Sequence, residues 1–287
     1  MEHFTLPTSE TQMVVALLVK TYAPCTIFAF GYSNNSTLER CLLPVVTDTV
    51  LTRHHFYLLV FTNKALPNAS NHIANVIAEQ SNKTITASVL LHKVSDLATK
   101  PEGQQWFFDS VLRFGQRLLL DASAPPYLLV NVVPPRAVEA ERTYWLKCVA
   151  VAQFMIHSAA ESVEQDVELC KIALLHAAIV EVALGLLRVF LGYTPNEFGL
   201  KYHLQLCCHF TDLPEQLFHY QTPEAISRYK MLCAPPSLLH HWTRLHAADS
   251  DFVLLLTACQ EFLSHADEIV LLELHRLENI SLISSPL

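Results

Sequence analysis

Two histidines and a tyrosine open a stretch that otherwise predicts a buried strand, "HHFYLLVFTN" at residues 54–63. Its second half, residues 58–61, is continuously apolar, which is typical of a strand covered on both faces. His54, His55 and Tyr57 would then stand where the strand emerges toward solvent, the end at which α/β folds often bind ligands. Because side chains alternate along a strand, His54 and His55 should face opposite sides, so they cannot chelate one ion together.

A second group of chemically capable side chains lies in "SLLHHWTRLHAADS", residues 237–250. On one helix, His240 and Arg244 are spaced i,i+4 and share a face, and His246 follows. An imidazole can act as a general acid or base, and a guanidinium can hold a phosphate. Together with Trp242 the cluster could instead stack on a base, or it could be an ordinary solvated face.

Composition limits the classes of protein to which the chain can belong. Of its 287 residues, 51% are hydrophobic and 16% are charged, which excludes disorder and allows two domains with separate cores. With only 6 glycines, a Gly-rich phosphate loop and a turn-rich all-β fold are both disfavoured. The net charge of -8 gives no overall attraction for nucleic acid.

The longest apolar segment, residues 171–193, reaches membrane-spanning length. His176, Glu181 and Arg188 interrupt it, and each would be costly in lipid, so we expect a central bundle helix and no membrane partner. Three interpretations are open: His176 and Glu181 form a hydrogen-bonded polar pair, Glu181 pairs with Arg188 two turns on, or His176 and Glu181 line a cleft between domains or protomers.

Cysteines and the N-terminus indicate the compartment. The 8 cysteines include no CxxC pair, and the first twenty residues lack the features of a signal peptide, so a cytoplasmic protein with reduced thiols is predicted. His203 and Cys207 have i,i+4 spacing, but no second half of a zinc site is evident. No metal and no cofactor are therefore expected.

The first third of the chain alternates helix and strand patterns. Ser9 is the expected N-cap of the first helix, and the apolar run that follows is expected to end at Gly31. Residues 39–52 fit either an extra strand or a long loop. The predicted elements are a helix over 9–22, strands over 25–33 and 54–63, a helix over 69–82, a strand over 84–93, a helix over 104–111 and a small strand over 114–123.

Two Pro-Pro pairs in "SAPPYLLVNVVPPRAVEAER" mark a domain boundary, since Pro-Pro disfavours a continuous helix. Gly192 and Pro195 in "GYTPN" should separate two later helices. We therefore predict an α+β chain, with an N-terminal α/β domain over 1–124 that holds a short mixed sheet and an all-α bundle over 138–280. Helices are predicted over 138–161, 167–191, 197–209, 223–233, 237–247 and 252–277.

The second half resembles the HEPN domain, a helical bundle of nucleotide-binding proteins and toxin ribonucleases. The likeness rests on "LLHAAIVEVALGLLRVFLGYTPNEFGLKYHL", residues 174–204, in which a His, small residues and a Glu precede a long apolar helix and a Gly-Tyr-x-Pro turn. The resemblance implies a homodimer through the bundle, for which the helix over 167–191 is the best candidate surface.

The first third resembles a minimal nucleotidyltransferase domain, the usual companion of that bundle. "IFAFGYSNNS" is similar to the family's strand and Gly-Ser turn, and "HHFYLLVFTN" to its "DSDIDLLV" strand. The resemblance places Gly31 and Ser33 at a turn near a phosphate, and His55 and Tyr57 at the positions of two carboxylates.

Those positions have lost the chemistry of the family. Carboxylates two residues apart on one strand hold the metal ions that bridge a triphosphate, whereas His55 and Tyr57 are poor Mg²⁺ ligands. The strand over 84–93 contains no Asp or Glu. In the bundle, no arginine has a histidine at the spacing of HEPN ribonucleases, and His240 and Arg244 stand in reversed order.

The sequence thus predicts a non-catalytic, nucleotide- or RNA-related binding or regulatory protein. Gly31, Ser33, His55 and Tyr57 are its candidate ligand-binding residues. The alternative is an enzyme: an active nucleotidyltransferase, or a metal-independent HEPN-type ribonuclease with His240, Arg244 and His246 in a rearranged site.

Overall fold

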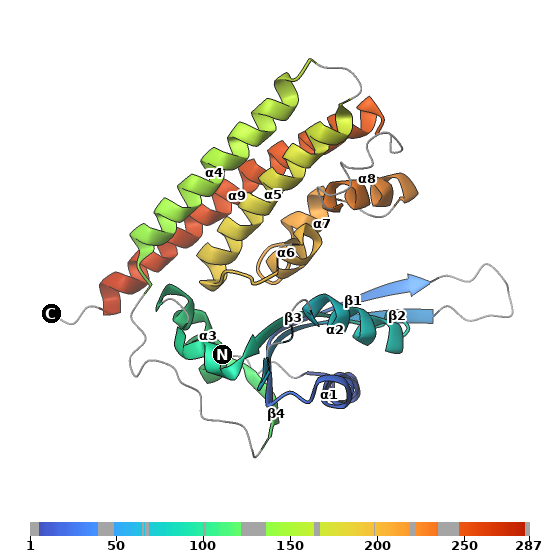
Figure 1. Ribbon diagram of the computed structural model, residues 1–287, viewed down its shortest axis with the longest axis vertical. Coiled ribbons are helices and arrows are strands. Elements are labelled where there is room, and N and C mark those ends of the chain that lie inside the picture. Colours follow the sequence, from blue (N-terminus) through green and yellow to red (C-terminus); the bar gives the residue numbers. More distant parts are fainter. Residues whose placement is uncertain are drawn as a thin grey trace, which may run out of the picture. The chain divides into compact units, whose positions relative to one another are not determined.

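The computed structural model describes residues 6–39, 49–64, 66, 69–99, 102–121, 136–163, 167–197, 199–218, 222–234 and 247–284. The chain divides into two compact units, Met1–Pro134 and Pro135–Leu287, and the division falls within the Pro-rich segment. A mixed sheet with helices forms the first unit, and helices form the second (Figure 1). The coarse prediction of an α+β chain, with a mixed sheet ahead of helices, is confirmed.

The first unit is built on a four-stranded sheet with the strand order β3-β2-β1-β4. Strand β1 is antiparallel to both β2 and β4, whereas β2 and β3 are parallel and joined by the helical crossover that parallel strands require. In chain order the elements are α1 (Thr8–Tyr22), β1 (Thr26–Glu39), β2 (Thr49–Thr62), α2 (Ala69–Gln80), β3 (Ile85–Lys93), the 3-10 helix η1 (Val94–Thr99), α3 (Glu102–Phe114) and β4 (Gln116–Leu120).

Helices cover both faces of β2, which explains its continuous apolar run. On one face Phe56, Leu58 and Val60 belong to a core that includes Val14 of α1 and Ile77 of α2. On the other face, the rings of β1 and β2 meet Phe107 and Phe108 of α3. The run over 58–61 is fully buried, as predicted.

Two predictions for this unit are wrong. Strand β1 does not end at Gly31 but continues to Glu39, with only a register irregularity between Ala29 and Gly31, because β2 offers a pairing partner along its whole length. Ser9 does not cap α1: it lies inside the helix and donates to Glu10, while Pro7 is the residue before the first turn.

Six helices make up the described part of the second unit. They are α4 (Val138–Glu161), α5 (Glu168–Leu191), α6 (Leu200–Cys207), α7 (Leu213–Leu217), α8 (Pro223–Cys233) and α9 (Asp249–Ser284). Gly192 ends α5 in the left-handed conformation, with φ of 65°, so the predicted break at this turn is confirmed. Most of the helix predicted over 237–247 lies outside the described residues.

Helix α5 is the core of this unit and packs beside α4 and α9 (Figure 1). Among the described helices it is the one long and apolar enough to cross a membrane, and 56% of its apolar stretch is buried within the protein. None of its described residues after Cys170 is exposed, so α5 packs mainly within the bundle. Its role as a dimer surface stays a prediction.

The polar residues of α5 are anchored within the bundle. The His176 ring lies 2.8 Å from the carbonyl oxygen of Leu232. Arg188 donates at 2.7 Å to Glu141 of α4, so its carboxylate partner is not the expected Glu181. These contacts fix the register of α5 against its neighbours.

Candidate ligand-binding site on the central strands

The structure brings the four predicted ligand-binding residues together. Gly31 is the cross-strand partner of Tyr57, and Ser33 is the partner of His55. Direct partners in an antiparallel pair share one face of the sheet, so the four positions form one patch. Gly31 and Ser33 lie inside β1, however, and the expected phosphate-binding turn is not formed there.

His55 is held by two hydroxyl groups of the neighbouring strand. Its Nδ1 lies 2.7 Å from Oγ1 of Thr86, and its Nε2 lies 3.0 Å from Oγ of Ser88. Both hydroxyls come from β3, where Thr86 and Ser88 alternate with the core residues Ala87 and Val89. The ring therefore has a fixed orientation.

Tyr57 is closed off beneath this pair. Tyr57 is only 3% exposed, and the centroid of its ring lies 4.6 Å from that of the His55 ring in an edge-on contact. Phe30 of β1 packs against the same tyrosine. Tyr57 thus supports the His55 ring from below, and its burial removes it as a ligand for anything in solvent.

These residues do not fit a pair of Mg²⁺ ions. On the neighbouring strands β2 and β3, the adjacent positions hold His55, Tyr57, Thr86 and Ser88, which offer neutral imidazole, phenol and hydroxyl groups in place of carboxylates. Among the residues that the structure describes, no three His, Cys, Asp or Glu side chains gather as a metal site.

The same face becomes exposed farther along the strands. Asn35 and Arg53 are cross-strand partners next to Ser33 and His55, and both are exposed. We call Ser33, Asn35, Arg53, His55, Thr86 and Ser88 the polar strip. Its groups are hydrogen-bond donors and acceptors with one guanidinium, which suits a polar or anionic ligand.

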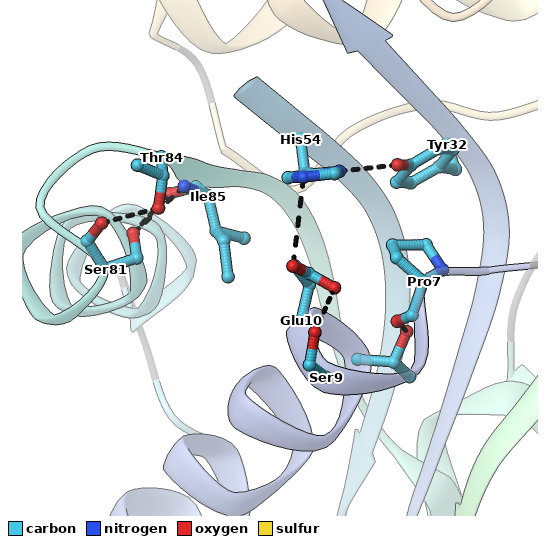
Figure 2. Close-up of polar contacts among 9 residues, drawn as sticks. Pro7, Ser9, Glu10, Tyr32, His54, Ser81, Thr84 and Ile85 are labelled. Atoms are coloured by element: carbon cyan, nitrogen blue, oxygen red, sulfur yellow. Dashed lines mark hydrogen bonds and ion pairs between the residues drawn. The ribbon is translucent and has the colours of Figure 1, made fainter. Parts of the chain in front are cut away.

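The opposite face carries a second polar cluster, centred on His54 (Figure 2). The Nδ1 atom of His54 lies 2.6 Å from the phenol oxygen of Tyr32, and its Nε2 lies 4.0 Å from a carboxylate oxygen of Glu10. Glu10 belongs to the first turn of α1, so the cluster ties this helix to the two central strands. His54 and His55 face opposite sides of β2, as predicted.

Protonation in this cluster follows from its surroundings. Burial, with the nearby Glu10 carboxylate adding to it, raises the pKa of Tyr32, so the phenol keeps its proton. A hydrogen bond from Ser9 lowers the pKa of Glu10 and favours its carboxylate form. The Tyr32 hydroxyl can therefore donate to Nδ1 of His54, while Nε2 faces Glu10.

Sequence patterns had not singled out Tyr32, Glu10, Thr86 or Ser88 as members of a site. A signal for the two hydroxyls did exist, because they occupy alternate positions of the strand beside His55. His240, Arg244 and His246 lie outside the described residues, so the proposed nuclease cluster remains a prediction. Comparisons with known protein families, curated proteins and solved structures find no match.

Proposed function

We propose that this protein is a non-catalytic binding or regulatory protein that holds a phosphate-bearing ligand, a nucleotide or an RNA end, on the polar strip without Mg²⁺. Its first unit would be a degenerate nucleotidyltransferase-type domain and its second a HEPN-like bundle. The observation that carries the proposal is the ring of His55, engaged by the hydroxyls of Thr86 and Ser88 at 2.7 and 3.0 Å.

The arrangement of β2 and β3 supports the degenerate transferase origin. Transferase chemistry needs carboxylates on neighbouring strands, and β2 and β3 are such neighbours, with His55 opposite Thr86 and Tyr57 opposite Ser88. None of the four positions holds a carboxylate, so the site has lost its ability to hold the metal ions of that chemistry. Turnover is therefore not expected.

The charge of the strip supports an anionic ligand. In a transferase, Mg²⁺ bridges two negative partners, the carboxylates and the triphosphate. Without the carboxylates, the guanidinium of Arg53 and neighbouring hydroxyl and amide groups can contact phosphate oxygens directly. A mononucleotide is favoured over a long RNA, because the net charge of -8 would repel an extended phosphate backbone.

A homodimer through the bundle remains part of the proposal, on helices other than α5. Helices α4 and α9 have large exposed apolar side chains, among them Phe154, which is 70% exposed, and Leu272, which is 73% exposed. Apolar surface of this kind is typical of helices that bind a partner. The expected partner is a second copy of the chain.

Isothermal titration calorimetry with ATP, in EDTA and in excess Mg²⁺, tests the ligand. We expect binding in EDTA, with an affinity about ten- to a hundredfold weaker for Arg53→Ala, since a charged hydrogen bond is lost. Arg113→Ala is the matched control, because that guanidinium is exposed on α3 and pairs with Asp109 one turn away.

Binding that depends on Mg²⁺ would favour the transferase alternative, and so would metal-dependent nucleotide transfer. Absence of heat in both conditions would remove the nucleotide ligand from the proposal. An equal loss of affinity in Arg53→Ala and Arg113→Ala would place the binding site away from the polar strip.

A further inference from the structure

Strands β1 and β2 run together well beyond the rest of the sheet (Figure 1). Strand β4 pairs with β1 only as far as Ala29, and β3 begins at Ile85, opposite His54. From these points to the pair Glu39 and Thr49, β1 and β2 form a two-stranded ribbon. We call residues 34–39 and 49–53 the β-arm.

The outer edge of β1 in the β-arm has an ordered set of backbone groups. The His54 amide donates at 2.8 Å to the carbonyl oxygen of Thr84, so the backbone of His54 is turned away from β1. In an antiparallel pair, the cross-strand partner of such a residue is turned outward as well, and this partner is Asn34. By alternation, the N–H and C=O groups of Ser36 and Leu38 also point outward from β1.

Between the register irregularity at Ala29 and Gly31 and the charge of Glu39, that edge has few of the features that usually prevent strands from pairing. Residues 32–38, "YSNNSTL", contain no charge, proline or glycine. Ser33, Asn34 and Asn35 are all exposed, so none of the described helices covers this part of the strand. The two outermost strands of the sheet differ from it, since β3 is largely buried and β4 is short and contains Arg117.

We propose that the outer edge of β1 in the β-arm pairs with the same edge of a second copy of the chain. The two strands would run antiparallel about a two-fold axis, which joins two ribbons into one four-stranded sheet. The structure supports this occupant because an antiparallel edge is self-complementary: each outward N–H of one copy can donate to an outward C=O of the other.

The low stability of an isolated ribbon and the lack of charge along this edge also favour a second copy as the partner. A two-stranded ribbon is at best marginally stable in water, whereas three or more strands support one another. Two copies that each carry a net charge of -8 repel, and the uncharged stretch over 32–38 is a place where their backbones can approach without opposing like charges.

Light scattering on the full chain tests the inference, with Phe154→Glu to remove the helical contact proposed above and proline at one edge of the ribbon or the other. Ser36→Pro removes an outward N–H of β1 and keeps the hydrogen bonds between β1 and β2, so we expect the dimer dissociation constant to rise at least tenfold. Val50→Pro is the matched control. Val50 is the cross-strand partner of Leu38, and its backbone N–H points outward from the other edge of the ribbon, so the dimer of this variant should persist.

Hydrogen exchange provides a second measurement that does not depend on a proline variant. The amides of Asn34, Ser36 and Leu38 should become protected as protein concentration rises, and that of Val50 should not. Asn34→Lys, which keeps its N–H and places like charges on facing edges, should also dissociate the dimer. Circular dichroism checks that each variant is folded.

Three results would overturn the inference. The first is a wild-type protein that stays monomeric at high concentration, and the second is equal dissociation by Ser36→Pro and Val50→Pro. The third is a dimer that survives Ser36→Pro and Asn34→Lys but dissociates with Phe154→Glu, since the helical unit would then hold the two copies together.

Discussion

Tyr32 and His54 are joined across β1 and β2 by a contact of 2.6 Å between the phenol oxygen and Nδ1. Because burial raises the pKa of Tyr32, the phenol is the donor to Nδ1 of His54, whose Nε2 faces Glu10. This contact sets the tautomer of His54 and fixes the position of α1 on the sheet.

Tyr32→Phe is expected to lower the free energy of unfolding by about 1 kcal/mol, since it removes this donor but keeps the ring that packs edge-on against Phe56. Nitrogen chemical shifts of His54 should change from one tautomer to a mixture. Tyr22→Phe is the control, because the Tyr22 hydroxyl is buried without a hydrogen-bond partner among the described residues. Its stability should stay the same or rise, and a larger loss than for Tyr32→Phe would contradict the assignment.

Substitution of the buried Glu141 should be among the most destabilising charge removals in the helical unit. Its carboxylate is 3% exposed and lies between Arg188, at 2.7 Å, and the buried Arg136, at 3.6 Å. Glu141→Ala leaves both guanidiniums without this counter-charge, so we expect a loss of about 3–5 kcal/mol in urea unfolding. Glu139→Ala, two residues away and 84% exposed, should cost no more than about 1 kcal/mol. Similar losses for the two variants would disprove the buried network.

The substitution Gly185→Ala shows whether helix propensity or packing has the larger effect on stability at this position. Alanine inside a helix normally stabilises by up to about 1 kcal/mol relative to glycine. A Cβ at Gly185, however, would lie 2.6 Å from the Trp145 ring, so we expect Gly185→Ala to destabilise by about 1–3 kcal/mol. Gly199→Ala, where the nearest atom is 3.9 Å away, should change stability little. Thermal melts decide the sign, and a more stable Gly185→Ala protein would show that the ring moves freely.

His203 should make the helical unit sensitive to acid. Burial lowers its pKa, because an imidazolium would be poorly solvated there, and the hydrogen bond from its Nε2–H to the carbonyl oxygen of Glu197 only partly opposes this shift. The unfolded chain therefore binds a proton more readily than the folded one, so stability is retained above about pH 6.5 and falls below it. The pKa of His209 is lowered by burial too, which adds to the same trend.

Urea midpoints at pH 7.5 and 5.5 measure this effect. His203→Gln keeps an N–H donor but cannot titrate, so its loss of stability on acidification should be smaller than that of the wild type. His275→Gln, whose native side chain is 75% exposed, should behave as the wild type does. If His203→Gln and the wild type lose the same stability, His203 does not control the acid response.

Elements with strong local signals could be predicted from the sequence. Helices α4 and α8 match their predicted ranges, because apolar periodicity, an early proline and flanking Pro residues define them locally. The extension of β1 past Gly31 could not be predicted, since "YSNNSTL" has little strand propensity and becomes a strand through its pairing with β2.

The site was predictable only in part. Alternation along one strand separated His54 from His55, and the structure confirms it. The hydroxyls of Thr86 and Ser88 are more than thirty residues from His55 in sequence, and which strand lies beside β2 follows from packing of the whole unit. For the same reason, the sequence could not show that Arg188 pairs with Glu141 and not with Glu181. This contact depends on how α4 packs against α5.

The pairing of Thr26 with Leu120 has a consequence for how the chain is made. Strand β1 leaves the ribosome early, but the strand that completes its edge follows almost a hundred residues later, and closing so long a loop slows folding. Helices α4 and α5, by contrast, are neighbours in sequence and can associate as soon as both have been synthesised. The first unit is thus the slower-folding of the two, and its sheet stays incomplete until β4 has been translated.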